Sequence, residues 1–293
     1  MATLDDVAVG RRSRRKLTGY WLILPGAVWL AFFFVVPFFT LLSASLYDPE
    51  GSVLTGYSMT WHVQNFADAF QEHWPTLWRS LWFAGVATLA CLLIGYVLAY
   101  AIAFKAGRWK NLMLILVIAP FFTSFLLRTL SWKLILADDG FIVNTLQLIN
   151  VLGPDGRLLA TPVAVIAGLT YNFLPFMVLP LYASLEKIDI RLIEASSDLY
   201  ASPIRGFFKV TWPLSMPGVV AGTLLTFIPA AGDFINAELL GSTNERMVGN
   251  EIQELFTSVG DYAEAGALSV ILMAIIIAMV IVWVRTSGTE DLV

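Results

Sequence analysis

The stretch from Glu186 to Gly218 reads EKIDIRLIEASSDLYASPIRGFFKVTWPLSMPG, and no other part of the 293-residue sequence says more about the fold. It is largely polar and lies between two apolar runs, 162–184 and 217–240. A connection of this length between two apolar segments is uncommon unless it forms a structure of its own or carries a function.

Within this stretch, the capping residues predict two short helices. Asp189 is suited to cap the first helix, and Ser202 followed by Pro203 is typical of the start of the second. Pro213 predicts that the second helix ends near Trp212, because the residue before a proline avoids helical backbone. The result is a helical hairpin with an apolar face. That face either fits a groove on a partner protein or packs against the chain's own helices.

Outside the hairpin, the chain is apolar enough to span a membrane repeatedly. It is 58% hydrophobic and 14% charged, whereas about a quarter of the residues of a soluble domain are charged. A spanning helix needs about 20 apolar residues, and five runs meet this length: 20–47, 80–104, 111–135, 162–184 and 265–284. A sixth run, 217–240, is interrupted by Pro229, Gly232, Asp233 and Glu238. We therefore expect an all-α membrane protein with about six transmembrane helices.

The basic residues predict the orientation of these helices, because Lys and Arg concentrate on the cytoplasmic side. With six spans both termini share a side. Placing that side in the cytoplasm leaves only Arg79, Arg128, Lys133, Arg157 and Arg246, of 18 Lys and Arg residues, outside or at the outer helix ends. The hairpin is then cytoplasmic, and segments 48–77, 136–161 and 241–263 face outward.

The chain divides accordingly into five parts. These are a basic cytoplasmic segment 1–18, a first transmembrane helix 19–47, an outer interfacial segment 48–77, a core 78–286 with the cytoplasmic loop 187–215, and a cytoplasmic tail 287–293. Ser13-Arg14-Arg15 before an apolar run is similar to a twin-arginine export signal, but the run is too long for one, which favours an uncleaved helix. Apolar stripes in the outward segments, such as Phe66, Phe70 and Trp74, indicate helices at the membrane surface or a docking surface for an external protein.

The centre of the hairpin resembles a known motif. Residues 194–202 read EASSDLYAS and are followed by Phe208, Val210, Pro213, Leu214 and Pro217-Gly218. This pattern is similar to the EAA loop of ABC importer permeases, roughly E-A-A-x-D-L-G-A-S. Tyr200 stands at the family's glycine, which puts the shape of the turn in question, because tyrosine adopts a positive φ only at a cost. The resemblance implies that the residues that couple the chain to an ATPase are Glu194, Ala195, Asp198, Leu199, Tyr200, Ala201 and Ser202.

The likeness extends over most of the chain. It includes the segments PFFTSF at 120–125, LPFMVLPLY at 174–182 and IPAAGDF at 228–234. Together they resemble the first permease subunit of bacterial spermidine/putrescine (polyamine) ABC importers. The resemblance implies a type I importer permease (MetI-like) fold in the bacterial inner membrane. It also implies a heterodimer with a second permease, two ATPase subunits and an external polyamine-binding protein, with membrane lipid around them and no nucleic acid.

The sequence contains no phosphate-binding loop of the form GxxxxGK[ST]. We therefore expect ATP and Mg to be bound by the partner subunits, with no cofactor, metal or catalytic residue in this chain. An ion-driven carrier or channel is the rival class, since it explains spans and buried acids but leaves the hairpin unexplained. An importer of another small solute is the alternative within the same class.

Ionisable and polar residues inside the apolar runs are candidates for the substrate pathway, because burying a charge in lipid is costly. Carboxylates attract ammonium groups, and aromatic rings add cation–π contacts. The candidates are Asp233, Glu238, Trp132, Tyr171, Asn172 and Phe234. For Arg128 and Lys133, which flank Trp132, we expect snorkelling to the interface or ion pairs with Asp138 and Asp139.

Overall fold

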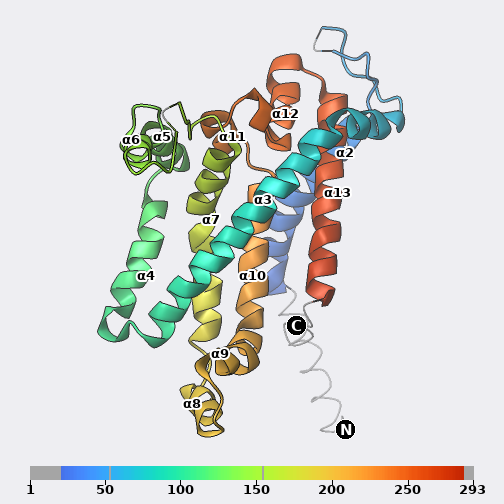
Figure 1. Cartoon of the computed structure of the whole chain (residues 1–293). Helices are drawn as coiled ribbons and strands as arrows, with labels where there is room; N and C mark the ends of the chain where they lie inside the picture. Colours follow the sequence, from blue (N-terminus) through green and yellow to red (C-terminus); the bar gives the residue numbers. More distant parts are fainter. Residues whose placement is uncertain (1–20, 53, 154, 287–293) are drawn as a thin grey trace, which may run out of the picture.

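The computed structural model describes residues 21–52, 54–153 and 155–286, so the predicted segments 1–18 and 287–293 lie outside the described residues. Within them the fold is helical, with two isolated β-bridges and no strand (Figure 1). The first helix is Trp21–Ala44, whose later parts are η1 (Ala31–Val35) and α2 (Val36–Ala44). The next elements are α3 (Gln64–Phe104), η2 (Gly107–Trp109), α4 (Lys110–Ile118), η3 (Ala119–Phe122), α5 (Phe125–Ile135), α6 (Phe141–Leu148) and α7 (Pro162–Leu185). They are followed by α8 (Ile190–Asp198), α9 (Pro203–Gly206), η4 (Phe207–Thr211), α10 (Trp212–Ala231), α11 (Ile235–Leu240), η5 (Thr243–Glu245), α12 (Val248–Glu254), η6 (Leu255–Val259) and α13 (Tyr262–Thr286).

The number of membrane spans agrees with the sequence. Five described helices are long and apolar enough to cross a bilayer, and a sixth candidate is a pair of helices joined at a sharp bend. An all-α membrane fold with about six spans is therefore confirmed.

The run 111–135 is not the single straight helix that its composition predicts. Gly107–Phe122 and Phe125–Ile135 meet at 94°. Thr123 and Ser124 have extended backbone, with ψ of 151° and 138°, so the helical hydrogen bonds stop there and restart at Phe125. This span is broken in its middle.

The predicted end of a helix near Trp212 is wrong, and the predicted span 217–240 is present with other bounds. One helix runs without interruption from Pro203 to Ala231. The π-helical turn η4 precedes Pro213, and its wider register tolerates the hydrogen bond that proline cannot donate. The helix ends at Ala231, and the chain resumes helical structure only in α11.

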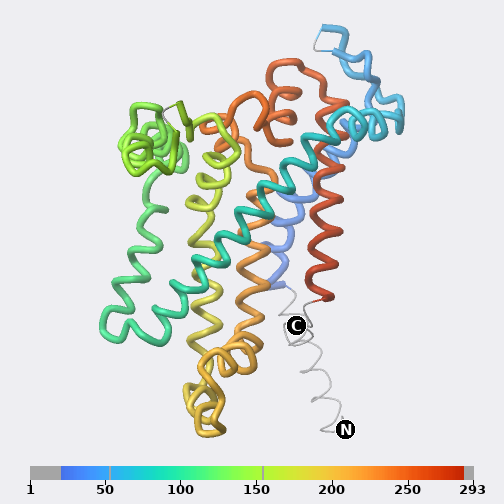
Figure 2. The backbone as a smooth tube through the Cα atoms, in the orientation of Figure 1, coloured from blue at the N-terminus to red at the C-terminus, as the bar shows by residue number. Residues whose placement is uncertain are grey.

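Helix α3 is longer than the apolar run predicts. It has 41 residues and continues through Pro75 without ending. The boundary at residue 77 between the outer segment and the core therefore falls inside this helix. In Figure 2 it crosses the molecule diagonally over α7 and α10, and it packs against both and against α13.

The core lies where α3, α7 and α10 meet. Small residues let these helices approach closely. A Cβ at Gly222 of α10 would lie 2.8 Å from the sulfur of Met177 on α7 and 3.1 Å from its carbonyl oxygen, so a larger residue there would require these atoms to shift. The buried side chains between these helices include Cys91, Met177, Leu181 and Val219.

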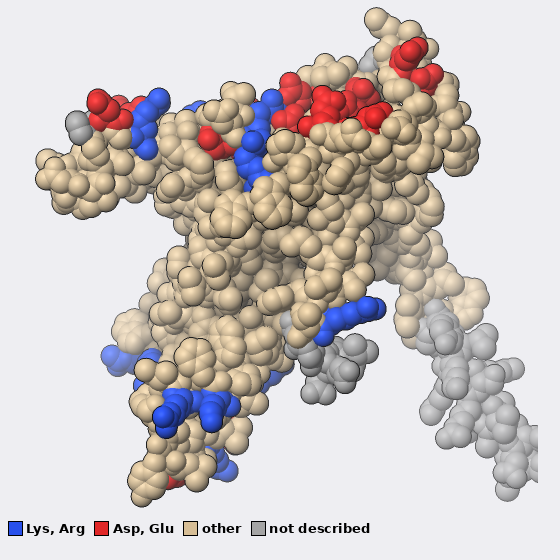
Figure 3. All heavy atoms as spheres, turned by 45° about the vertical axis from the view of Figure 1, so that its right-hand side comes forward, with Lys and Arg blue, Asp and Glu red and all other residues tan. Residues whose placement is uncertain are grey.

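The two ends of the bundle carry opposite charges. In Figure 3 the Lys and Arg side chains gather mainly at the end that carries the α8–α9 hairpin, whereas most visible Asp and Glu side chains lie at the end with α12. The hairpin and the α11–α12 segment therefore lie at opposite ends of the molecule.

Candidate coupling and transport sites

The hairpin that joins α7 to α10 forms as the capping residues predict. Asp189 Oδ1 accepts a hydrogen bond from the backbone N–H of Arg191 at 3.0 Å, and Ser202 Oγ accepts one from Arg205 at 3.4 Å. The two helices touch closely at Gly206, where a Cβ would lie 2.9 Å from the hydroxyl of Ser196. A small residue at position 206 therefore sets the spacing of the hairpin.

The backbone conformation of Tyr200 shows whether the turn of the hairpin keeps the shape that a glycine would give it. Its φ is +57°, so it adopts the left-handed conformation that glycine favours. Its side chain is 97% exposed, and no packing of the ring within the described chain compensates for the strain. The turn thus keeps a glycine-like shape at a residue for which that conformation is unfavourable.

The candidate coupling residues face outward. Leu199 is 81% exposed, Glu194, Ala195, Asp198 and Ser202 are also exposed, and Ala201 is half-buried. Leu192, Ile204 and Phe208 add exposed apolar surface. The hairpin's apolar face therefore does not pack fully against the chain's own helices, which favours the interpretation that it fits a partner.

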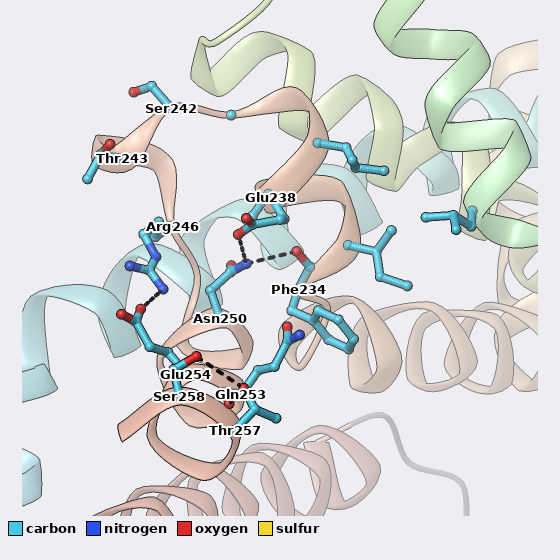
Figure 4. Close-up of a pocket in the computed structure, with 15 residues that line it drawn as sticks. Phe234, Glu238, Ser242, Thr243, Arg246, Asn250, Gln253, Glu254, Thr257 and Ser258 are labelled. Carbon is cyan, nitrogen blue, oxygen red and sulfur yellow. Dashed lines mark hydrogen bonds and ion pairs between the residues drawn. The ribbon is translucent and has the colours of Figure 1, made fainter. Parts of the chain in front are cut away.

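A pocket of about 690 Å³ opens at the other end of the molecule, between α11 and the segment from η5 to η6 (Figure 4). Two of the predicted pathway residues, Phe234 and Glu238, line it. The remaining lining is mostly polar: Ser242, Thr243, Arg246, Asn250, Gln253, Glu254, Thr257 and Ser258.

Asn250 fixes the position of Glu238 in this pocket. Its side-chain amide donates hydrogen bonds to Glu238 Oε2 at 3.1 Å and to the backbone carbonyl of Phe234 at 2.9 Å (Figure 4). Its Oδ1 accepts from the N–H of Met247 and so caps the first turn of α12, the helix to which Asn250 belongs. The Glu238 carboxylate is therefore held at the wall of the pocket with acceptor capacity left.

Arg246 pairs with another acid at the pocket. Its guanidinium binds the Glu254 carboxylate, and this hydrogen bond raises the pKa of Arg246 above its ordinary value. Arg79 of α3 donates to the Arg246 carbonyl at 2.6 Å, so the pocket wall is fastened to the bundle. The pocket thus presents one cation, Arg246, that ion pairs with Glu254 and Glu251 already engage, and the Glu238 carboxylate, which interacts with Arg246 at longer range but forms no ion pair with a Lys or Arg of the described chain.

Asp233 lies outside the pocket lining, in the gap between α10 and α11. Its Oδ1 accepts hydrogen bonds from the backbone N–H of Asn236 at 2.8 Å and from its side-chain amide at 3.1 Å. Asn236 Oδ1 in turn accepts from Asn172 of α7, whose amide also donates to Thr129 of α5. We call Thr129, Asn172, Asp233 and Asn236 the outer polar cluster; all four are buried. Asp233 therefore binds the first turn of α11, and the cluster as a whole links α5, α7 and α11.

The remaining pathway candidates lie beside this cluster. Trp132 and Tyr171 form an edge-to-face pair with ring centroids 5.4 Å apart, on α5 and α7. Arg128 does not snorkel or pair with Asp138 or Asp139 as the sequence predicts, because it is buried and Asp138 binds Arg157 instead. The sharp bend before α5 turns Arg128 into the protein. The structure thus divides the six candidates into three pairs. Phe234 and Glu238 line the pocket, Asp233 and Asn172 belong to the outer polar cluster, and Trp132 and Tyr171 contact each other through their rings.

Several residues that shape these sites carry no sequence signal of their own. Asn236, Asn250 and Arg246 are single polar residues in mixed segments; Asn236 reaches Asp233 within one helical turn, whereas only the folded arrangement brings Asn250 to Glu238 and Arg246 to Glu254. Among the described residues, Glu72, His73 and Glu264 also place their ligand atoms within 4.8 Å of one another. His73 Nε2 and Glu264 Oε1 are 2.8 Å apart, a contact that ties α3 to α13.

Comparisons with known proteins agree with this architecture. The family model of the binding-protein-dependent transport system inner membrane component matches residues 92–287. The spermidine/putrescine transport system permease protein PotB of Haemophilus influenzae is 37% identical over 260 residues, which cover 88% of this chain and 90% of that protein. PotB of Escherichia coli is 35% identical, with 88% and 94% covered.

The fold has solved counterparts as well. A chain of a bacterial ABC transporter involved in the import of the acidic polysaccharide alginate superimposes with a TM-score of 0.74 over 97% of this chain and 99% of its own length, at 17% identity. The likeness in fold, together with a family model that covers more than half of the sequence, leads to one conclusion. This chain belongs to the family of binding-protein-dependent transport system inner membrane components.

Proposed function

We propose that this permease imports a polyamine such as spermidine or putrescine into the cytoplasm, powered by ATP that partner subunits bind with Mg and hydrolyse. The observation that carries the proposal is the 37% identity, over 88% of the chain, to a spermidine/putrescine permease. The pocket at the outer end supports it, because a carboxylate beside an aromatic ring suits an alkylammonium ion.

The complex that we propose contains a second permease, two ATPase subunits and an external binding protein. The exposed coupling residues of the hairpin are suited to dock on an ATPase, since apolar and acidic side chains there have no cover from the described part of the chain. The concentration of Lys and Arg at the hairpin end supports a cytoplasmic location for that end, and for both termini. The α11–α12 end then faces the external binding protein.

Within the pocket, Glu238 is the residue that we propose to receive an ammonium group. It lines the pocket beside Phe234, and the side chain that donates a hydrogen bond to it there is a neutral amide. Asp233 is the weaker candidate, because two hydrogen bonds from Asn236 already engage its carboxylate and it lies outside the pocket lining. Burial alone would rank Asp233 above Glu238 as the acid that binds the substrate. The geometry of the pocket reverses this order.

Uptake of labelled spermidine and putrescine by the assembled complex in proteoliposomes tests this proposal. Glu238→Gln keeps the side chain's shape and is expected to lower uptake about tenfold, with complex assembly unchanged. Asp138→Asn is the matched control, since this exposed carboxylate lies outside the pocket and its loss is expected to leave uptake unchanged. A wild-type complex that takes up neither polyamine contradicts the proposed substrate, and full uptake by Glu238→Gln contradicts the role of Glu238.

A further inference from the structure

Three side chains with metal-ligating atoms meet where the outer part of α3 passes the first turn of α13. Glu72, His73 and Glu264 each offer one ligand atom, and these atoms lie within 4.8 Å of one another. His73 Nε2 and Glu264 Oε1 are 2.8 Å apart, and the two side chains are 12% and 27% exposed. A hydrogen bond explains this pair, but it does not explain why the Glu72 carboxylate lies beside it.

The charges around these three side chains favour a cation. No Lys or Arg of the described residues lies within 4.0 Å of the Glu72 or Glu264 carboxylate. Asp261 adds a further carboxylate, whose Oδ1 accepts a hydrogen bond from the backbone N–H of Glu264 at 2.9 Å. Carboxylates this close repel each other unless a positive charge lies between them. That charge can come from a proton on His73 or from a metal ion, and only a metal ion uses all three ligand atoms at once.

Helix packing holds two of the three ligands in place. Ala69 and Leu77, one turn before and one turn after His73 on α3, are buried in the same apolar cluster as Leu268, which lies one turn after Glu264 on α13. His73 and Glu264 thus extend from packed helix faces, as the fixed geometry of a metal site requires. Zinc ligands lie about 2.0–2.2 Å from the ion, which places neighbouring ligand atoms about 3.3 Å apart. Side-chain rotation, mainly of the exposed Glu72, is enough to reach that spacing.

We propose that Glu72, His73 and Glu264 bind a Zn²⁺ ion, which fastens the outer part of α3 to α13. An imidazole nitrogen with two carboxylates suits zinc better than Ca²⁺ or Mg²⁺, which prefer ligands made of oxygen alone. The three residues lie outside the pocket lining, so the site does not depend on which solute is carried. His73 and Glu264 are 191 residues apart in the sequence, so no motif spacing reveals the site, and the proposal departs from the expectation of a chain without a metal.

Zinc content after equilibrium dialysis tests the site. The assembled importer is purified with a tag that contains no histidine and is dialysed against ZnCl₂. His73→Gln keeps a hydrogen-bonding side chain but is a poor ligand, so we expect bound zinc to fall by about one ion per copy of this chain. His62→Gln is the matched control, because it removes the only other histidine of the sequence, an exposed one, and is expected to leave the zinc content unchanged. Equal zinc content in the wild type and in His73→Gln overturns the proposal.

A second experiment keeps His73 intact, in case the glutamine variant does not accumulate. Glu264→Gln removes a charged ligand but leaves His73 a hydrogen-bond acceptor. Since an ion that binds only the folded chain stabilises it, Zn²⁺ is expected to raise the unfolding temperature of the wild-type complex and of the control Asp138→Asn, and to raise that of Glu264→Gln much less. No rise in the wild type, or an equal rise in Glu264→Gln, overturns the proposal. Because both experiments measure zinc and not uptake, a wrong substrate assignment would leave their results unchanged.

Discussion

The α8–α9 hairpin and the outer polar cluster both contain carboxylates, but their surroundings differ. Glu194 and Asp198 of the hairpin are exposed at the end of the molecule, and the described chain gives neither of them an ion pair. Asp233 of the cluster is 9% exposed and accepts two hydrogen bonds from Asn236. The chain itself thus accounts for the buried acid and not for the exposed ones.

This contrast bears on how function is inferred from burial. A buried carboxylate in a membrane protein is a functional candidate by default, because burying it is costly. Here two hydrogen bonds from Asn236 offset part of that cost, and they give Asp233 a structural role. Exposed acids are solvated by water at no such cost, so burial says nothing about their role, and the docking role of Glu194 and Asp198 rests on the resemblance of the hairpin to a coupling loop. The comparison predicts that substitutions in the hairpin affect the coupling of ATP hydrolysis to uptake, and that substitutions in the outer polar cluster affect folding stability.

Replacing both Glu194 and Asp198 by Ala is expected to have the largest effect. The two acids lie one helical turn apart on α8, where they can face basic groups of an ATPase together. We expect at least a tenfold loss of ATP-driven uptake, measured in proteoliposomes, with the permease still inserted and thermally stable. The measured quantities are uptake, ATPase recovery and the unfolding temperature of the permease.

Its control is the pair Asp138→Ala and Arg157→Ala, which removes exposed charges from the opposite end of the molecule. Those changes are expected to leave coupling unchanged. Normal uptake with full ATPase recovery in the hairpin variant would contradict the docking role of α8.

How far the sequence predicts this molecule also differs between the two regions. The spans follow from apolar length and the hairpin from local capping signals at Asp189 and Ser202, both of which involve residues close together in the chain. The bend at Thr123 and Ser124 is marked only by Pro120 and by these two short polar residues, and the apolar length of the run outweighs them as a signal for one continuous span. The continuation of the helix past Trp212 depends on the π-helical turn η4, which a proline rule does not anticipate.

The outer polar cluster is beyond sequence patterns for a related reason. The sequence singles out Asp233 and Asn172, but it does not connect them, because the link passes through Asn236 and requires α7 and α11 to be side by side. The same holds for Glu238 and Asn250 at the pocket. Contacts between distant segments decide which candidate faces a cavity and which is engaged inside the protein.

Gly168→Ala tests the structural role of the cluster and is expected to have an intermediate effect. A Cβ at this position of α7 would lie 2.4 Å from Leu240 Cδ1 and 2.7 Å from Asn236 Oδ1, so it would push α11 away from α7. We expect a destabilisation of about 1–3 kcal/mol, because overpacking a tight contact costs about this much. The measurement is thermal unfolding of the purified permease in detergent, followed by tryptophan fluorescence.

Gly85→Ala is the matched control for this change. Gly85 lies in α3, and a methyl group added there would meet no atom of the described chain within 4 Å. Alanine also favours a helix by about 1 kcal/mol over glycine. An unfolding temperature for Gly168→Ala that equals or exceeds that of Gly85→Ala would show that the contact between α7 and α11 is not tight.

Tyr200→Gly is expected to have the smallest effect, and it refines the interpretation of the hairpin. Tyr200 has a φ of +57° and an almost fully exposed ring, so glycine removes strain of about 1 kcal/mol without removing packing in the chain. Glycine also loosens the unfolded chain by about 0.5–1 kcal/mol, and the two effects leave a net change near zero or slightly stabilising. Ala201→Gly is the control, because Ala201 has no positive φ and incurs only the second effect.

Hydrogen–deuterium exchange of the hairpin amides compares the two variants, and we expect slower exchange in Tyr200→Gly. If both glycines loosen the hairpin equally, the turn at Tyr200 is not strained. If Tyr200→Gly stabilises the hairpin yet weakens ATPase recovery, the exposed ring itself contacts the partner, and the strain at this turn is the cost of presenting it.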